Sequence, residues 1–335
     1  MKLRLTHILL PMAAMLLTMA SCKSSKKADA ETETMTMVGP TFNADSAYAF
    51  CAKQCEFGPR TMNSEAHDKC GEWIAAKFRE YGCTVTEQKA DLKAFDGTVL
   101  KSTNIIASYK PELTTRILLC AHWDCRPWAD NDPDSTNWRK PVMGANDAAS
   151  GVAVMLEVAR LIQKADSLQM GVDFVCFDAE DWGVPQWSDN QDTNGDSWAL
   201  GAQYWAENPH KPGYEARFGI LLDMVGGRDA RFCYEGFSLR YAREWMVRTW
   251  DAAQRAGAAH LFVQQEGGYA QDDHVPLNEV AGIPTFDIIP YVEGEHSFGA
   301  TWHTVSDTPE NLSRETLKGV GQTLLQLFAE NPISE

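Results

Sequence analysis

The strongest constraint on the fold is an alternation between apolar strand-like runs and segments with helical periodicity. Residues 117–121 are apolar throughout, as expected of a strand that is covered on both faces. The predicted strands cover residues 83–88, 103–109, 116–121, 172–177, 218–225 and 283–289. The predicted helices cover residues 63–81 (with Asn63 as N-cap), 148–165, 238–256 and 310–329. This order predicts an α/β fold, a three-layer α/β/α sandwich with a central, mostly parallel mixed sheet.

Polar side chains stand where these strands end, which is where ligands collect in open α/β sheets. Each has an ordinary explanation when taken alone: Asp147 suits a helix N-cap, and His303 suits an exposed surface. Their number at one edge is what indicates a site. The residues are His122, Asp124, Asp147, Asp178, Glu180, Asp181, Asp223, Asp272, Asp273, His274, Asp287 and His303.

Several carboxylates and imidazoles at one edge of a sheet repel one another unless a cation binds among them. Zinc suits this need, because imidazole and carboxylate groups bind it at about 2.0–2.2 Å and leave a position open for a substrate. Calcium would favour more oxygen ligands and no imidazole. The sequence therefore predicts Zn²⁺ as the cofactor.

The N-terminal residues predict export. A basic start with Lys2 and Arg4 precedes an apolar run over residues 8–20, which is too short to span a bilayer and suits a signal peptide. The small residues before Cys22 resemble the lipobox of bacterial lipoproteins, in which the cysteine is acylated; an ordinary signal peptide is the alternative. We expect a lipoprotein signal peptide at residues 1–21, an acylated Cys22 with a flexible tether over residues 22–40, and a single catalytic domain over residues 41–335. The mature chain would be lipid-anchored on the periplasmic side of a bacterial membrane.

The charge balance bears on partners. The formal net charge of −16 offers no cationic face for nucleic acid, and it opposes docking on anionic lipid. We expect contact with a membrane only through the lipid anchor. Of the eight cysteines after Cys22, Cys120 and Cys176 lie in apolar strand-like runs and are expected to be buried thiols, and the other pairings stay open.

The strand-end motifs resemble those of the zinc exopeptidase clan, in its aminopeptidase branch and its animal-type glutaminyl cyclase branch. The resemblance runs from about Thr103 to Phe328 and is carried by the motifs at residues 122–124, 144–151, 177–181, 222–223 and 302–304. In the aminopeptidase branch, it implies one zinc on His122, Asp147 and Asp223, a second on Asp147, Asp181 and His303, and Glu180 as general base. Asp181 stands where the family usually has glutamate.

Other residues favour the cyclase branch. The segment 186–192 with Trp187, the segment 271–276 with Asp272, and Trp302 before His303 resemble cyclase motifs. The resemblance implies a single zinc on Asp147, Asp181 and His303, with His122 and Asp223 as second-site candidates. It also implies proton handling by Glu180, Asp223 and Asp272, and substrate binding by Trp187, Trp302, Gln271 and Asp287. Asp287 replaces a histidine of the animal enzymes.

The chemistry of a cyclase fits this residue set. An N-terminal glutamine cyclises when its α-amine attacks its own γ-carboxamide and releases ammonia, so no protein nucleophile is needed, and the strand-end set offers no Ser–His–Asp arrangement. We therefore expect a zinc-dependent glutaminyl-peptide cyclotransferase acting on the N-terminal segments of peptides or proteins. A two-zinc aminopeptidase is the alternative, and an inactive peptide-binding lipoprotein is a third reading.

Overall fold

A computed structural model describes residues 39–164, 168–189, 196–290 and 298–330. The chain divides into two units, Met1–Thr34 and Met35–Glu335, and every described residue belongs to the second. The predicted signal peptide, Cys22 and nearly all of the predicted tether lie outside the described residues. No helix in the described ranges is long and apolar enough to cross a membrane.

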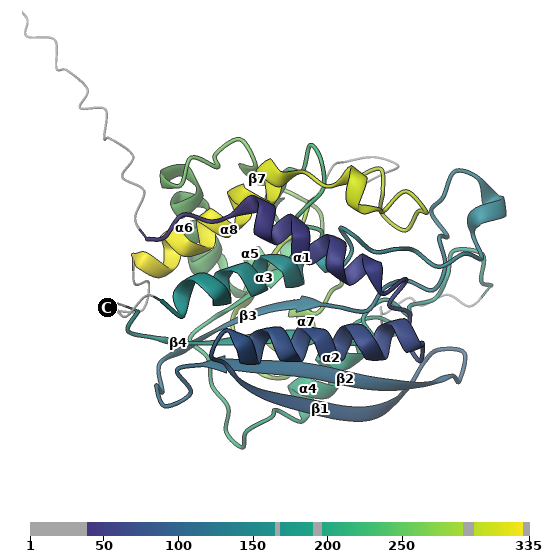
Figure 1. Cartoon of the computed structure of the whole chain (residues 1–335), viewed down its shortest axis with the longest axis horizontal. Helices are drawn as coiled ribbons and strands as arrows, with labels where there is room; N and C mark the ends of the chain where they lie inside the picture. Colours follow the sequence, from purple (N-terminus) through teal and green to yellow (C-terminus); the bar gives the residue numbers. More distant parts are fainter. Residues whose placement is uncertain (1–38, 165–167, 190–195, 291–297, 331–335) are drawn as a thin grey trace, which may run out of the picture. The chain divides into compact units, whose positions relative to one another are not determined.

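A six-stranded mixed sheet organises the second unit (Figure 1). Its strands are β1 (Thr84–Lys93), β2 (Val99–Tyr109), β4 (Gly171–Phe177), β3 (Arg116–His122), β5 (Gly219–Leu222) and β8 (Thr285–Ile288), in that spatial order. The hairpin partners β1 and β2 are antiparallel, as are β2 and β4. The remaining pairs, β4 with β3, β3 with β5 and β5 with β8, are parallel. The carboxyl ends of β3, β4, β5 and β8 therefore meet at one edge.

Helices cover both faces of the sheet and give the predicted three-layer α/β/α sandwich. The helices are α1 (Ala44–Glu56), α2 (Glu65–Glu80), α3 (Ala149–Ile162), α4 (Leu200–Glu207), α5 (Gly236–Tyr241), α6 (Arg243–Arg255), α7 (His274–Glu279) and α8 (Arg314–Ala329). Alternate residues of β3 separate the two cores: Leu119 packs with the α1, α2, α3, α6 and α8 side, and Leu118 packs with the α4 and α7 side. Figure 1 shows α1, α3 and α8 gathered beside one another.

Local hydrogen bonding explains where the helices differ from prediction. Helix α2 begins at Glu65 because the Ser64 side chain accepts from the His67 N–H and serves as the N-cap. Asn63, predicted as the cap, instead bonds to β2, where its side chain meets the Val99 carbonyl and the Lys101 N–H. The helix predicted over residues 238–256 is broken at Ala242, whose φ of −135° is not helical.

Several elements had no counterpart in the predictions. They are α1, α4, α7, the short helical turn Ser135–Asn137, and the two-stranded sheet of β6 (Phe232–Tyr234) and β7 (Phe262–Glu266). The helix predicted over residues 310–329 begins only at Arg314, and the start of the predicted range lies in a separate helical turn, Pro309–Asn311. All eight cysteines of the described residues are free thiols. Cys120 and Cys176 are fully buried, as expected for the centre of a covered sheet.

Candidate active site and metal-binding clusters

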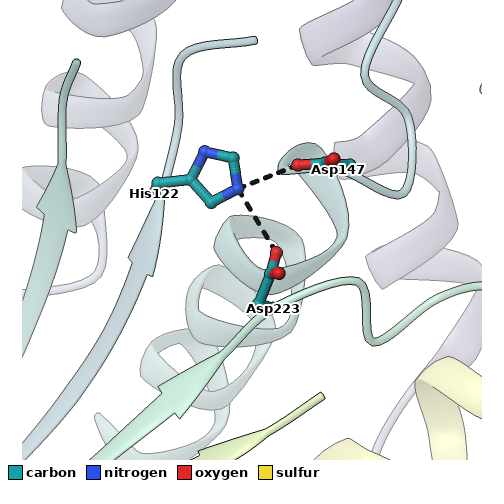
Figure 2. A group of neighbouring side chains, drawn as sticks. All are labelled: His122, Asp147 and Asp223. Atoms are coloured by element: carbon teal, nitrogen blue, oxygen red, sulfur yellow. Dashed lines mark hydrogen bonds and ion pairs between the residues drawn. The ribbon is translucent and has the colours of Figure 1, made fainter. Parts of the chain in front are cut away.

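Asp147 lies at the centre of the strand-end cluster and is shared by two groups of potential metal ligands. In the first group, His122 Nε2 is 2.9 Å from Asp147 Oδ1 and 3.3 Å from Asp223 Oδ1 (Figure 2). His122 is the last residue of β3, Asp223 directly follows β5, and Asp147 precedes α3. The peptide bond between Asp147 and Ala148 is cis.

The second group joins Asp147 to Asp181 and His303. His303 Nε2 is 3.3 Å from Asp181 Oδ1 and 3.6 Å from Asp147 Oδ2. Within each group the potential ligand atoms lie within 4.8 Å of one another, and all of these side chains are buried. The backbone of His303 has a left-handed φ of 54°, which is uncommon outside glycine and is concentrated at functional sites.

The donor chemistry of the second group fits a divalent cation. Asp181 Oδ2 is buried and has no hydrogen-bond partner, an arrangement that costs free energy unless an ion or water binds there. Burial raises the pKa of Asp181, with His303 opposing and Asp147 adding to the shift. Two carboxylates and an imidazole this close together are a donor set that could hold a metal ion.

A close approach of helix to sheet brings the first group together. A Cβ on Gly151 of α3 would collide with the carbonyl of Leu222 and lie 2.8 Å from Ala121 Cβ. The glycine therefore lets the start of α3, and with it Asp147, reach the ends of β3 and β5.

Two buried carboxylates fix the loops that carry the potential ligands. Asp124 accepts hydrogen bonds from the backbone N–H groups of Glu180 (3.1 Å) and Asp181 (3.2 Å). Asp307 accepts from the N–H groups of Asn146 (2.8 Å) and Asp147 (3.0 Å). Burial, followed by the charge of Asp147, raises the pKa of Asp307 to about 7. These hydrogen bonds fix the backbone of Asp147 and Asp181, two members of the second group.

Arg126 supplies a buried positive charge beside the second group. Its guanidinium makes two 2.6 Å hydrogen bonds to Asp130, and its Nη1 lies 3.3 Å from Asp181 Oδ1. Asp130 Oδ1 is 3.7 Å from His303 Nδ1. Neither Arg126 nor Asp130 was predicted as a site residue. Their i, i+4 spacing just after a strand end was the available signal.

A cavity of about 510 Å³ opens onto both groups. The predicted residues Glu180, Asp223, Asp272, Gln271 and Trp302 all line it, together with Asp147 and His303. Burial raises the pKa of Glu180 well above its ordinary range. Burial and the neighbouring charge of Asp272 raise the pKa of Asp223 to about 8. The cavity therefore holds carboxyl groups whose proton affinity is increased, which is typical of sites that move protons.

Trp187 and Asp287, both expected to contact substrate, do not line this cavity. Trp187 lies outside it, stacked on Trp138 (centroids 6.2 Å apart), with the Arg139 guanidinium 4.0 Å from its ring. Asp287 is fully buried in β8, where burial and then Asp272 raise its pKa well above the ordinary range. Of the segment 186–192, residues 190–192 lie outside the described residues.

Trp198, and not Trp187, is the tryptophan of this connection that lines the cavity. It lines the cavity, and its ring is stacked on that of His303, with centroids 5.9 Å apart and planes 6° from parallel. The Arg126 guanidinium lies 4.6 Å from the same ring. Sequence reasoning missed Trp198 because both tryptophans belong to one long connection between β4 and α4, which has no periodicity to tell them apart.

Comparison with known proteins agrees with this fold and these motifs. The pattern of peptidase family M28 matches residues 104–328. The chain therefore belongs to peptidase family M28.

Solved structures that carry the names of both branches of the predicted clan are similar to this chain. The chain is similar to the crystal structure of a Bacteroides thetaiotaomicron glutaminyl cyclase, with 47% identity and a TM-score of 0.86 over 88% of this chain and 100% of that one. It is equally similar to a structure described as a leucine aminopeptidase precursor of Bacteroides thetaiotaomicron VPI-5482, with 47% identity, a TM-score of 0.85 and the same coverage.

A curated relative is more distant. The glutaminyl-peptide cyclotransferase of Bothrops jararaca is 29% identical over 258 residues, which is 68% of this chain. The match spans 64% of that relative's own length.

Proposed function

We propose that the protein is a glutaminyl-peptide cyclotransferase, which converts the N-terminal glutamine of peptides to pyroglutamate and releases ammonia. The observation that carries this proposal is the composition of the cavity. Glu180, Asp223 and Asp272 meet there beside Trp302. The described residues that line the cavity include no serine, threonine or cysteine that could act as a nucleophile. A reaction in which the substrate attacks itself needs no such side chain.

We propose that Asp147, Asp181 and His303 hold a zinc ion, supported by the imidazole and carboxylate donor set and by the unpartnered Asp181 Oδ2. When bound, the ion would act as a Lewis acid that polarises the substrate's γ-carboxamide carbonyl. Neighbouring residues hold the three proposed ligands in place. Arg126 lies beside Asp181, and Asp130 lies beside His303. Asp307 accepts a hydrogen bond from the backbone N–H of Asp147.

The chain's own residues perform the proton transfers. The Glu180 carboxylate takes a proton from the substrate's α-amine and returns it to the departing amide nitrogen. Burial raises the pKa of Glu180, which makes its carboxylate a stronger proton acceptor than an ordinary glutamate. Asp223 and Asp272 share a proton and hold the departing nitrogen. Burial and then the charge of Asp272 raise the pKa of Asp223, and burial raises the pKa of Asp272. Trp198 and Trp302 line the cavity beside His303 and limit the access of water, which would compete with the amine.

Mass spectrometry of a short Gln-initiated peptide tests the proposal. Incubation with the protein should lower the peptide mass by about 17 units, the mass of the ammonia released in the reaction described above. Free ammonia should appear in equal amount. Release of an intact N-terminal residue, without ammonia, would refute cyclisation.

A two-metal aminopeptidase is the second candidate, and the completeness of the first cluster favours it. His122, Asp147 and Asp223 are as closely grouped as Asp147, Asp181 and His303. Metal analysis of active protein separates the candidates. Two tightly held ions per chain with stepwise release of amino acids would support the aminopeptidase, and one ion with ammonia release would support the cyclase.

We also propose that the chain is exported and anchored through an acylated Cys22, on the periplasmic side of a bacterial membrane, where it meets the N-terminal segments of peptides. The apolar run over residues 8–20 and the small residues before Cys22 support this. Detergent phase partitioning provides the test. The expressed full chain should enter the detergent phase, and Cys22→Ser should move it to the aqueous phase.

A further inference from the structure

One loop, residues 126–132, holds His303 of the second ligand group from two directions. The Asn131 N–H donates to the His303 carbonyl (3.1 Å). Asp130 Oδ1 lies 3.7 Å from His303 Nδ1, and the other ring nitrogen, Nε2, faces Asp181 Oδ1 at 3.3 Å. A carboxylate beside the second nitrogen of a metal-binding histidine fixes the orientation of its ring. The loop therefore sets both the backbone and the ring of His303.

The Arg126 guanidinium joins this loop to Asp181. Its Nε and Nη2 each donate to Asp130 at 2.6 Å. Its Nη1 lies 3.3 Å from both the backbone carbonyl and the side-chain Oδ1 of Asp181, and 3.5 Å from the Gly183 carbonyl. All three charged side chains are at most 1% exposed. The guanidinium therefore offsets two buried carboxylates that would otherwise repel each other.

The same guanidinium also contacts the wall of the cavity. The centre of the Trp198 ring lies 4.6 Å from Arg126 Cζ, and that of the Trp128 ring lies 5.4 Å away. Trp198 lines the cavity and stacks on His303. A planar cation can stack on aromatic rings and form hydrogen bonds in its own plane at the same time. Arg126 therefore touches a potential metal ligand and a ring of the cavity wall through one rigid group.

We propose that Arg126 is a positioning residue that couples the second ligand group to the Trp198 wall, and that lysine cannot replace it. The proposal rests on the proposed function, because it takes Asp181 and His303 as zinc ligands and Trp198 as a wall of the glutamine pocket. Arg126 is not among the described residues that line the cavity, so it acts through the residues that it contacts. A lysine would keep the charge, but its flexible ammonium group has no plane to stack and cannot donate to Asp130 and Asp181 in this fork.

Zinc affinity is the direct readout, because it needs no catalytic activity. The full chain, freed of metal, is titrated with zinc in competition with a chromophoric chelator. Arg126→Lys and Asp130→Asn should each weaken zinc binding by about 10- to 100-fold, the usual cost of losing a residue that orients metal ligands. Circular dichroism and thermal unfolding of the same preparations check that each variant is folded.

Arg116→Lys is the matched control. Arg116 makes the same two-pronged contact with Asp173, with hydrogen bonds of 2.6 and 2.7 Å, and both residues are buried. It is the first residue of β3, whereas His122, which belongs to the candidate site, is the last. Arg116→Lys should therefore lower stability but change zinc affinity by less than about twofold.

Kinetics at saturating zinc test the link to the cavity wall. With the metal site filled, Arg126→Lys should still lower kcat/KM for a Gln-initiated peptide by about three- to tenfold, because Trp198 loses a stacking partner. Trp198→Ala should cause a similar loss. The double variant should lose clearly less than the product of the two single losses, since both substitutions break the same contact.

The outcomes separate the coupling from the proposed function. Unchanged zinc affinity in Arg126→Lys, or an equal loss in Arg116→Lys, would overturn the positioning of the metal ligands. Independent, multiplicative losses in the double variant would overturn the link to Trp198. If Arg126→Lys does not fold, Asp130→Asn, which removes one charge at nearly constant volume, decides the first point by the same criterion. If zinc affinity depends on Arg126 as expected but no Gln-initiated peptide is cyclised, the proposed function alone fails.

Discussion

Glu180 is the residue on which the proposed proton transfers depend. It lines the cavity, and burial raises its pKa well above the ordinary range. Glu180→Gln keeps the shape and removes the base, so we expect kcat to fall by about 10²- to 10⁴-fold with bound metal unchanged. Kinetics and elemental analysis on the same preparation provide the measurement. Glu207→Gln, the same change at an exposed position, is the control, and a loss below tenfold for Glu180→Gln would contradict the assignment.

Trp198 and Trp187 give a paired test of which tryptophan forms the cavity wall. Trp198 lines the cavity and stacks on His303, whereas Trp187 packs outside it against Trp138 and Arg139. We expect Trp198→Ala to lower kcat/KM for a Gln-initiated peptide by about three- to tenfold, the equivalent of one lost aromatic contact. Trp187→Ala should change it less than twofold. The reverse order of effects would show that the ring at position 187 contacts substrate.

The two tryptophans also show which site residues could be predicted from the sequence and which could not. Asp181 and Asp223 were predictable because they closely follow parallel strands that end at one edge of the sheet. Asp147 and His303 lie in longer connections, and the family resemblance was what assigned them to the same ligand group. The direction of a side chain inside a long loop depends on contacts with distant segments. Trp198 is fixed by His303, more than a hundred positions further along the chain, and no local pattern contains that information.

Among the elements, α5 shows how a capping side chain supports the site. Glu235 accepts hydrogen bonds from the N–H groups of Phe237 and Ser238 at the start of α5, from Ala270 N–H, and from His274 Nε2 at the start of α7. It therefore ties together the segments that carry Phe237, Ala270 and Asp272. Burial opposes its ionisation, but the hydrogen bonds from His274 and Ser238 outweigh burial and lower its pKa to about 2.

This cap gives a prediction about stability and pH. Since folding lowers the pKa of Glu235 from an ordinary 4.5, its stabilisation is fully present above pH 4.5 and is lost as the pH falls toward 2. Glu235→Gln should reduce the free energy of unfolding by about 3 kcal/mol at pH 7, and the difference from wild type should shrink between pH 4.5 and 2. Urea unfolding at several pH values measures it, with the exposed Glu266→Gln as control. A difference that does not depend on pH would contradict the low pKa.

The break between α5 and α6 shows why element boundaries were less predictable than elements. Apolar residues continue in helical register across Ala242, so the pattern over residues 238–256 reads as one helix. The break follows from the Glu235 cap, which anchors α5 to residues 270 and 274 in space. The N-cap of helix α2 differs from the prediction by one position, because Asn63 and Ser64 are both good caps and only the contact of Asn63 with β2 decides between them.

For the folded unit as a whole, the clustered carboxylates link stability to metal. Asp147 belongs to both ligand groups, and Asp124, Glu180 and Asp223 lie close by. A bound cation would offset their repulsion, so we expect that removal of metal with a chelator lowers Tm by about 5–10 °C and that added zinc restores it. Thermal unfolding measures the change. In Asp147→Asn, which impairs both groups, the chelator should have little effect; an equal shift in that variant would place the stabilising metal elsewhere.

At the same scale, the fold class was predictable and the strand order was not. Buried strands alternating with helices define a three-layer sandwich, as found. The position of β4 between β2 and β3 depends on how the connections cross the sheet. An apolar run predicts a buried strand, but it does not indicate which other strands pair with it. The small sheet of β6 and β7 was missed because Phe232–Tyr234 is too short to produce a pattern.

The double membership of Asp147 has an evolutionary consequence. A change at His122 alone removes one ligand group and leaves Asp147, Asp181 and His303 intact, so no loop needs rebuilding to alter the number of ions. A single substitution would therefore separate a chain with two candidate ligand groups from a chain with one.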